Sequence, residues 1–220
     1  MHCMKRVVLA AAFVAMLAPP PAVAASLGID ITGEGIAGQN PVAFTIGWGV
    51  DVIAPVRVTA LGIWDEGSNG LLVSHAVGLW TGAGTLLAST TIPAGSAADI
   101  AVPSVQGDGR WLFEDIADLI LPVGHYVLGS TSAGDDFRAN QDGVILDPSL
   151  ANFDPAQFAV GAALQFPDQD AQAQLGLSLF GPNLLLEQVT APAPLPASLA
   201  LIGLGLLGLG ARRAVRRSAR

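Results

Sequence analysis

Short runs of β-branched and aromatic residues, separated by turn-forming residues, most constrain the fold of this chain. They recur every 10 to 15 residues between positions 44 and 189, and Gly, Pro, Asn and Asp fill the gaps. No long stretch shows the 3.6-residue period of an amphipathic helix. The pattern predicts an all-β body, a single antiparallel β-sandwich of the jelly-roll or immunoglobulin-like class, over residues 26–190. The expected strands are 44–50, 56–64, 76–80, 86–92, 110–116, 125–130, 175–180 and 184–189.

One segment of the body, residues 154–165, is compatible with either a helix or a strand. Asp154 followed by Pro155 is a typical helix start, and the alanines that follow are helix formers. The apolar run with Phe158 is equally compatible with a strand, and the sequence slightly favours a strand at 157–166. Both alternatives stay open at this point.

The N-terminus, residues 1–25, has the three parts of a signal peptide. Lys5 and Arg6 precede an apolar run over 7–17, and small residues at 22–24 place a cleavage site after Ala24 or Ala25. Cleavage would remove the single cysteine, Cys3, so the mature body would have no disulfide and would depend on core packing alone.

The mature body is strongly acidic. All 18 Asp and Glu residues lie in it, against three basic residues (Arg57, Arg110 and Arg138), which gives a formal net charge of −15. Such a charge excludes nucleic acid and anionic lipid headgroups as partners. It suits solubility outside the cell, divalent cations, or a polyanionic matrix cross-linked by them.

The C-terminus has three successive parts. A Pro-rich linker (191–196) leads to an apolar segment (197–211) that we expect to be a transmembrane helix, and a basic end (212–220) follows. The 14 uncharged residues 197–210 would reach only ~21 Å as a helix, short of a ~30 Å hydrocarbon core. The arginines would stay in the cytoplasm. So short a span suits a temporary stop during export better than a lasting anchor.

This tail resembles the PEP-CTERM sorting tail of Gram-negative bacteria. The matching features are a short motif (Pro194, Leu195, Pro196 and Ala197), the Leu/Gly helix and the basic tail (Arg212, Arg213, Arg216 and Arg217). The central acidic residue of the family is Leu195 here, which makes a Pro-Leu-Pro-Ala variant. The resemblance implies transient anchoring in the inner membrane by the C-terminal helix. Processing by an exosortase would then deliver the body to the cell surface or extracellular matrix.

Two other interpretations of the tail compete with this one. A plain C-terminal anchor would never be cut. A sortase signal would need Thr and Gly where this chain has Ser198 and Leu199.

The body also resembles a recurrent ectodomain of PEP-CTERM proteins and uncharacterised β-sandwich modules of bacterial surface proteins. The resemblance rests on the runs at 58–65, 74–80 and 121–127. It implies the sandwich fold and no activity.

Three tryptophans spaced 16 residues apart, Trp48, Trp64 and Trp80, have two interpretations. Large aromatic residues within apolar strands usually fill the core, whereas an exposed row would form a platform for sugars. Trp64 is the best platform candidate because it borders the polar loop 65–70. Asp65 and Asn69 of that loop offer the oxygen ligands that calcium prefers, although loop residues of this kind also simply make turns.

Other candidate sites are weaker. His75 and His125 could bind a metal only if the fold brought them together. The string Gly33–Gly38 matches a dinucleotide fingerprint, but Pro41 and the strand after it leave no room for the required helix. Nucleophile motifs are missing, so we expect no catalytic residue, no cofactor, no resident metal and no enzyme.

The sequence therefore predicts an exported structural or adhesive component of exopolysaccharide or biofilm, with an exosortase and an extracellular polysaccharide as partners. A carbohydrate- or calcium-binding module is the alternative, and an unrecognised hydrolase with paired carboxylates is the second alternative.

Overall fold

The computed structural model describes residues 24–39, 43–134 and 136–189 and confirms the all-β prediction. It contains one short helix, α1 (Ala171–Leu175), in the described part of the chain. The strands are β1 (Ser26–Leu27), β2 (Ile29–Thr32), β3 (Ile36–Gln39), β4 (Phe44–Val52), β5 (Val56–Glu66), β6 (His75–Thr81), β7 (Leu86–Ile92), β8 (Ile100–Pro103), β9 (Gly109–Leu121), β10 (Gly124–Thr131), β11 (Asp136–Ala139), β12 (Gly143–Leu146), β13 (Leu150–Val160), β14 (Gln169–Asp170), β15 (Leu179–Phe180) and β16 (Pro182–Gln188).

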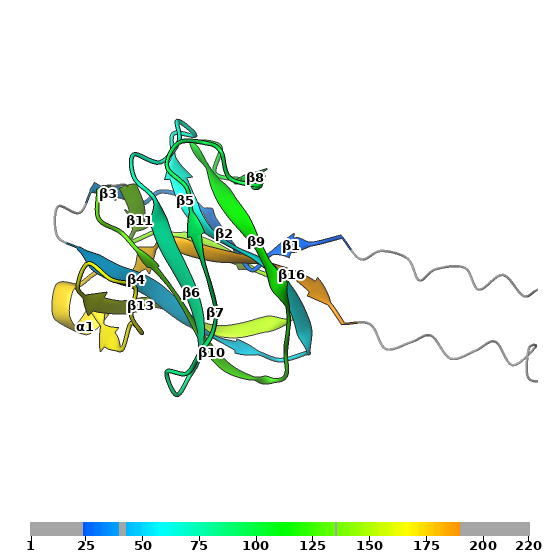
Figure 1. The fold of residues 1–220 in the computed structure, drawn as a ribbon. Helices are drawn as coiled ribbons and strands as arrows, with labels where there is room; N and C mark the ends of the chain where they lie inside the picture. Colours follow the sequence, from blue (N-terminus) through cyan, green and yellow to red (C-terminus); the bar gives the residue numbers. More distant parts are fainter. Residues whose placement is uncertain (1–23, 40–42, 135, 190–220) are drawn as a thin grey trace, which may run out of the picture.

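Two antiparallel sheets form the sandwich (Figure 1). One sheet has the order β1-β16-β5-β9-β8, and the other has the order β14-β13-β4-β10-β6-β7. Two small sheets, β15-β11-β3 and β12-β2, lie beside them. Every strand pair is antiparallel, as expected for a body built from short strands and tight turns.

The main core lies between the two large sheets. Val56 and Val58 of β5 are fully buried and belong to the same cluster as Trp48 and Leu128 of the opposite sheet. A register shift between Val58 and Ala60 interrupts the alternation, so Leu61, which pairs with Leu184, follows Val58 on the inward face. A second cluster, which includes Phe137, Phe158 and Leu179, joins β11 and β15 of the small sheet to β13 and α1. All members of both clusters fall within residues 29–186, so the body has a complete core of its own.

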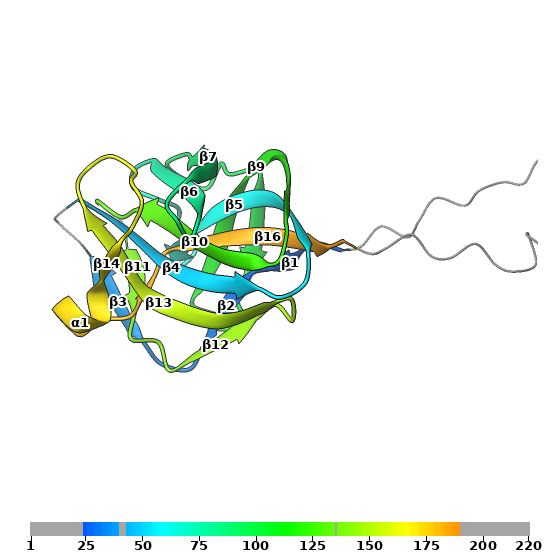
Figure 2. The ribbon, with the colours of Figure 1, turned by 90° about the horizontal axis from the view of Figure 1, so that it is seen from below.

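Both ends of the body meet at one end of the sandwich. Ser26 of β1 pairs with Leu186 of β16, and the two strands lie side by side at the right of Figure 1. Helix α1 lies at the opposite end of the molecule, as Figure 2 also shows. Ala24 and Ala25 are exposed and directly precede β1, so cleavage at either residue would leave the β1–β16 pair intact.

The ambiguous segment is a strand as far as Val160. β13 contains two register shifts, one on each side of Asp154, and Pro155 lies within the second, where strand pairing is interrupted. The strand predicted for 175–180 is wrong over most of its length. Asp170 caps α1 by accepting a hydrogen bond from Ala173 N (2.9 Å), and only Leu179 and Phe180 are in a strand.

Candidate functional site

Trp64, the best candidate for a ligand platform, is fully buried near the end of β5. Its ring packs edge to face against Trp111, with centroids 5.0 Å apart and planes at 68°. Its Nε1 donates to the Glu66 carboxylate at 2.6 Å. A buried ring cannot offer a face to a sugar, so the structure contradicts the platform interpretation of Trp64. It confirms the core interpretation, which Trp48 and Trp80 share.

Asp65 and Asn69 do not converge on a ligand. The Asp65 side chain is 1% exposed, and its two oxygens accept from Arg110 Nε (2.7 Å) and Gly70 N (3.0 Å). Asn69 is exposed at the tip of the loop. Asp65 therefore ties the loop to β9 and has no oxygen left that faces solvent.

The next carboxylate along, Glu66, is also bound to an arginine. Arg138 of β11 donates to both Glu66 oxygens, at 2.7 and 2.8 Å, and also contacts Asp108. Its guanidinium carbon lies 5.8 Å from the Trp64 ring centroid. Arg110 and Arg138, two of the three basic residues of the body, thus neutralise the carboxylates around the candidate calcium loop. These carboxylates need no bound cation to balance their charge.

A buried carboxylate that sequence reasoning missed, Asp30, supports the same end of the sandwich. It accepts hydrogen bonds from Trp111 Nε1 (3.0 Å), Ser104 Oγ (2.6 Å) and Val105 N (2.9 Å). These donors lie 74 to 81 residues away in sequence, so no local pattern could have linked them to Asp30. The carboxylate joins β2 to the turn before β9 and has a structural role.

The two histidines lie at opposite ends of the paired strands β6 and β10. His75 begins β6, whereas His125 lies near the start of β10, where Tyr126 pairs with Thr81 at the end of β6. His75 Nδ1 contacts the Thr131 carbonyl at 2.6 Å. The fold therefore does not bring the two histidines together as the metal interpretation requires. Within the described residues, no cluster of three or more His, Cys, Asp or Glu could hold a metal.

His125 belongs instead to an exposed polar cluster with Asp51 and Asn152. The Asp51 carboxylate contacts His125 Nδ1 at 2.8 Å and accepts from Asn152 Nδ2 at 2.6 Å. These two hydrogen bonds, first that from Asn152, lower the pKa of Asp51. Asn152 has a left-handed backbone (φ 51°) beside the first register shift of β13, which turns its side chain towards Asp51. The cluster resembles the orienting half of a catalytic dyad, but no serine or cysteine nucleophile contacts it in the described structure.

A groove of about 520 Å³ runs between β7 and β9. Leu87–Thr90 line one side and Asp115–Leu119 the other. The groove exists because β8 pairs only with residues 110–113 of β9, so the rest of β9 has no neighbour on that side. Sequence reasoning missed the groove, since it depends on which strands lie at the sheet edges.

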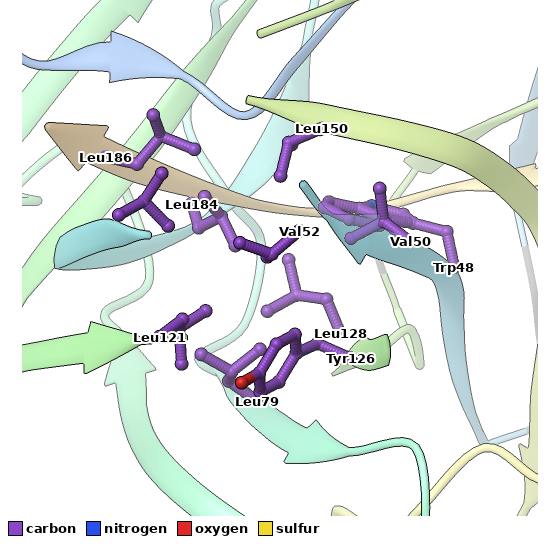
Figure 3. Close-up of a pocket in the computed structure, with 11 residues that line it drawn as sticks. Trp48, Val50, Val52, Leu79, Leu121, Tyr126, Leu128, Leu150, Leu184 and Leu186 are labelled. Carbon is purple, nitrogen blue, oxygen red and sulfur yellow. The ribbon is translucent and has the colours of Figure 1, made fainter. Parts of the chain in front are cut away.

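Another cavity lies inside the core and is only about 10 Å³ in volume, roughly one water-sized space. Figure 3 shows Trp48, Leu79, Leu128 and Leu184 around it, and all of its lining side chains are apolar or aromatic. A space this small holds no ligand and is an ordinary packing defect.

Trp80 lies on the outer face of its sheet, across a row of glycines. Gly78, Gly129 and Gly47 are register partners on three neighbouring strands. A Cβ added at Gly78 would lie 2.5 Å from the Trp80 ring, so only glycine leaves room for it. Phe166 packs against the ring from outside, with centroids 6.1 Å apart. Trp80 is 4% exposed and thus serves a small outer core.

In the described part of the chain, no helix begins at or soon after the dinucleotide-like string 33–38. The string runs into β3, which agrees with the sequence argument against a phosphate site there.

The comparisons identify the tail. Residues 192–217 match the family model of the PEP-CTERM protein-sorting motif. This range includes the predicted motif and the four arginines of the basic tail, which lie outside the described residues. No curated protein and no solved structure matches the chain.

Among the described residues, no helix is long and apolar enough to span a bilayer, and the predicted span at 197–211 lies outside them. The chain thus carries a PEP-CTERM sorting motif at residues 192–217, which marks it as an exported protein that is anchored transiently at the membrane and processed by an exosortase.

Proposed function

We propose that the body is a non-catalytic structural or adhesive component that the tail delivers to the cell surface or extracellular matrix. The observation that carries the proposal is the sorting motif at 192–217, which follows β16 directly in the chain. Because β16 pairs with β1, the described chain begins and ends at the same end of the sandwich. Processing at either end removes chain without disturbing a core residue.

The charge of the body supports a role in a matrix. A net charge of −15 keeps the body soluble and lets it share bridging divalent cations with acidic polysaccharide. The partner in this proposal is therefore an extracellular polysaccharide, held through cations at many exposed carboxylates rather than in one pocket.

The alternatives have less support. The carbohydrate platform loses Trp64 to the core, and the predicted calcium loop gives its Asp65 carboxylate to Arg110. A hydrolase would require carboxylates that face each other across a cleft. The two acidic residues that line the β7–β9 groove, Asp115 and Asp118, come from the same strand.

Deletion of residues 192–220 tests the proposal. We expect the body to leave the cell-surface or matrix fraction of its host and to accumulate elsewhere. A variant with Arg212, Arg213, Arg216 and Arg217 all changed to Lys keeps the charge and serves as the control, which should be sorted normally. An unchanged location of the deletion variant would contradict the proposal.

Titration of the isolated body with Ca²⁺ and glycans separates the alternatives. A matrix component that shares cations over many exposed carboxylates should show only a weak, unsaturated rise in melting temperature with Ca²⁺. A saturable shift at low ligand concentration would instead indicate a dedicated binding module.

A further inference from the structure

Strand β7 forms an edge of the six-stranded sheet that lacks the usual protection. The two large sheets have four edge strands: β1 and β14 have two residues each, β8 has four and β7 has seven. Short edge strands offer few backbone groups to another chain. β7 is the exception, and its far side has no strand partner in the described structure.

Other unpaired edges are guarded by charge or by irregular backbone. The free part of β9 carries Glu114, Asp115 and Asp118, and β13 carries Asp154, Pro155 and two register shifts. These are devices that block pairing between chains.

β7 has the sequence Leu-Leu-Ala-Ser-Thr-Thr-Ile, without charge or proline. Its single register shift, at Leu87, leaves Ala88–Ile92 regular. Leu86 and Leu87 are 50% and 37% exposed at its start.

The charge distribution indicates what this edge accepts. Between Glu66 and Asp99 the chain contains no Asp, Glu, Lys or Arg, although the body carries a net charge of −15. Two bodies repel each other over most of their surfaces, and the β6–β7 hairpin is a neutral stretch where they can approach. Asp115 and Asp118 line the other side of the groove and would repel an acidic strand, but not a neutral one.

We infer that β7 is a self-association edge, where β7 of a second copy pairs antiparallel with it. An antiparallel pair of identical strands is self-complementary, so the contact has two-fold symmetry and closes as a dimer. It would join the two six-stranded sheets into one continuous sheet across the interface. The contact is small, so the dimer is weak and depends on concentration, as suits a protein crowded on a surface or in a matrix.

Sedimentation velocity of the isolated body (residues 26–189) tests the inference. We expect a shift from monomer to dimer over protein concentrations from about 1 μM to about 1 mM, the range of dissociation constants typical of small interfaces. Higher salt should strengthen the dimer, because it screens the repulsion between two acidic bodies. A body that stays monomeric over the whole range, or whose dimer weakens with salt, would overturn the inference.

Two lysine substitutions locate the contact. Ser89→Lys places a charge in the middle of β7 and should weaken the dimer at least tenfold. Gln172→Lys makes the same charge change on the exposed surface of α1 and should leave the dimer unchanged. Equal effects of the two substitutions, or a dimer that survives Ser89→Lys, would place the contact elsewhere.

A labelling experiment covers the case in which Ser89→Lys impairs folding. The mature body has no cysteine, so a nitroxide on Thr91→Cys or on Gln172→Cys is the only label. We expect dipolar broadening at high concentration from the β7 label alone, because paired strands lie ~5 Å apart. Broadening from both labels or from neither would contradict the inference. A monomeric body whose β7–β9 groove binds a glycan would also contradict it. The inference concerns the body alone, so its outcome is independent of where the tail delivers the protein.

Discussion

Arg138 lies over the ring of Trp64 while it binds both oxygens of Glu66, the same carboxylate that accepts the Trp64 indole N–H. One guanidinium therefore fixes a core tryptophan, an acidic loop residue and the small sheet that contains β11. The side chain of Arg138 is 6% exposed and that of Glu66 is 18% exposed. Solvent thus screens this ion pair much less than a surface pair.

Arg138→Met should destabilise the body strongly, because it leaves the Glu66 carboxylate partly buried without its partner. We expect a loss of about 3 kcal/mol in the free energy of unfolding, measured by urea denaturation. Arg57 makes surface contacts with Asp118 (3.7 Å) and Glu187 (3.6 Å), so Arg57→Met is the control and should cost no more than about 1 kcal/mol. Equal losses in the two variants would refute the structural role of Arg138.

Asp30→Asn should weaken the contact between β2 and the turn before β9. The amide of the new Asn accepts hydrogen bonds less strongly than the Asp30 carboxylate, and its NH₂ group faces other donors. We therefore expect the free energy of unfolding, measured by urea denaturation, to fall by about 2 kcal/mol. Trp111 bonds directly to Asp30, so its fluorescence should also change. Asp168 is exposed, and Asp168→Asn should alter neither quantity. An unchanged midpoint of urea denaturation in Asp30→Asn would show that the carboxylate contributes nothing to stability.

The parts of the fold that could be predicted are those with a local signal. The strand 86–92 has the predicted bounds because Gly84 and Pro93 bracket a uniform β-prone run. The burial of Trp48, Trp64 and Trp80 follows from their places within apolar strands. The tail could be identified because a sorting motif is read as linear sequence.

The missed parts depend on contacts between distant segments. Residues 26–39 gave no clear strand signal, yet Ile29 and Ile31 of β2 are fully buried in the main core. Asp30 looked like any other acidic residue until Trp111, 81 residues away, was placed against it. The expected ligand loop was misjudged for the same reason, since nothing in 65–70 indicates that Arg110 would bind Asp65.

The glycine row under Trp80 should tolerate no side chain. In Gly78→Ala the new methyl group would lie 2.5 Å from the ring, so the tryptophan must move, at a cost of roughly 1–3 kcal/mol. Urea denaturation and a red shift in tryptophan fluorescence would report the change. Ser89 is the register partner of Gly78 but is exposed, so Ser89→Ala is the matched control and should stay within about 0.5 kcal/mol of the parent. A stable Gly78→Ala protein with unchanged fluorescence would show that the ring does not need the space.

Loss of the proton from the Glu114 side chain should make the body less stable as pH rises. Partial burial and then the nearby Asp99 carboxylate raise the pKa of Glu114 above its ordinary value of 4.5. The folded state therefore holds a proton that the unfolded state has lost, and stability falls as pH rises through the window just above 4.5.

Glu114→Gln removes this titration. It should raise the melting temperature at neutral pH and flatten its dependence on pH between the ordinary and the raised pKa. Glu34→Gln, a substitution of an exposed residue with the same charge change, is the control for net charge. A variant at position 114 that follows the parent at every pH would count against the raised pKa.

Processing of the tail can be read from the mass of the mature polypeptide. Exosortase processing at the 192–217 motif predicts that protein recovered after export lacks Arg220 and the rest of the basic tail. If Pro194–Ala197 is replaced by a Gly-Ser sequence of equal length, the tail should remain attached and the protein should stay in the membrane fraction. The body should be unaffected, because its last strand ends at Gln188 and its core at Leu186. Intact-mass measurement of the parent decides the matter: a mature protein that still ends at Arg220 would mean that the tail serves as a permanent anchor.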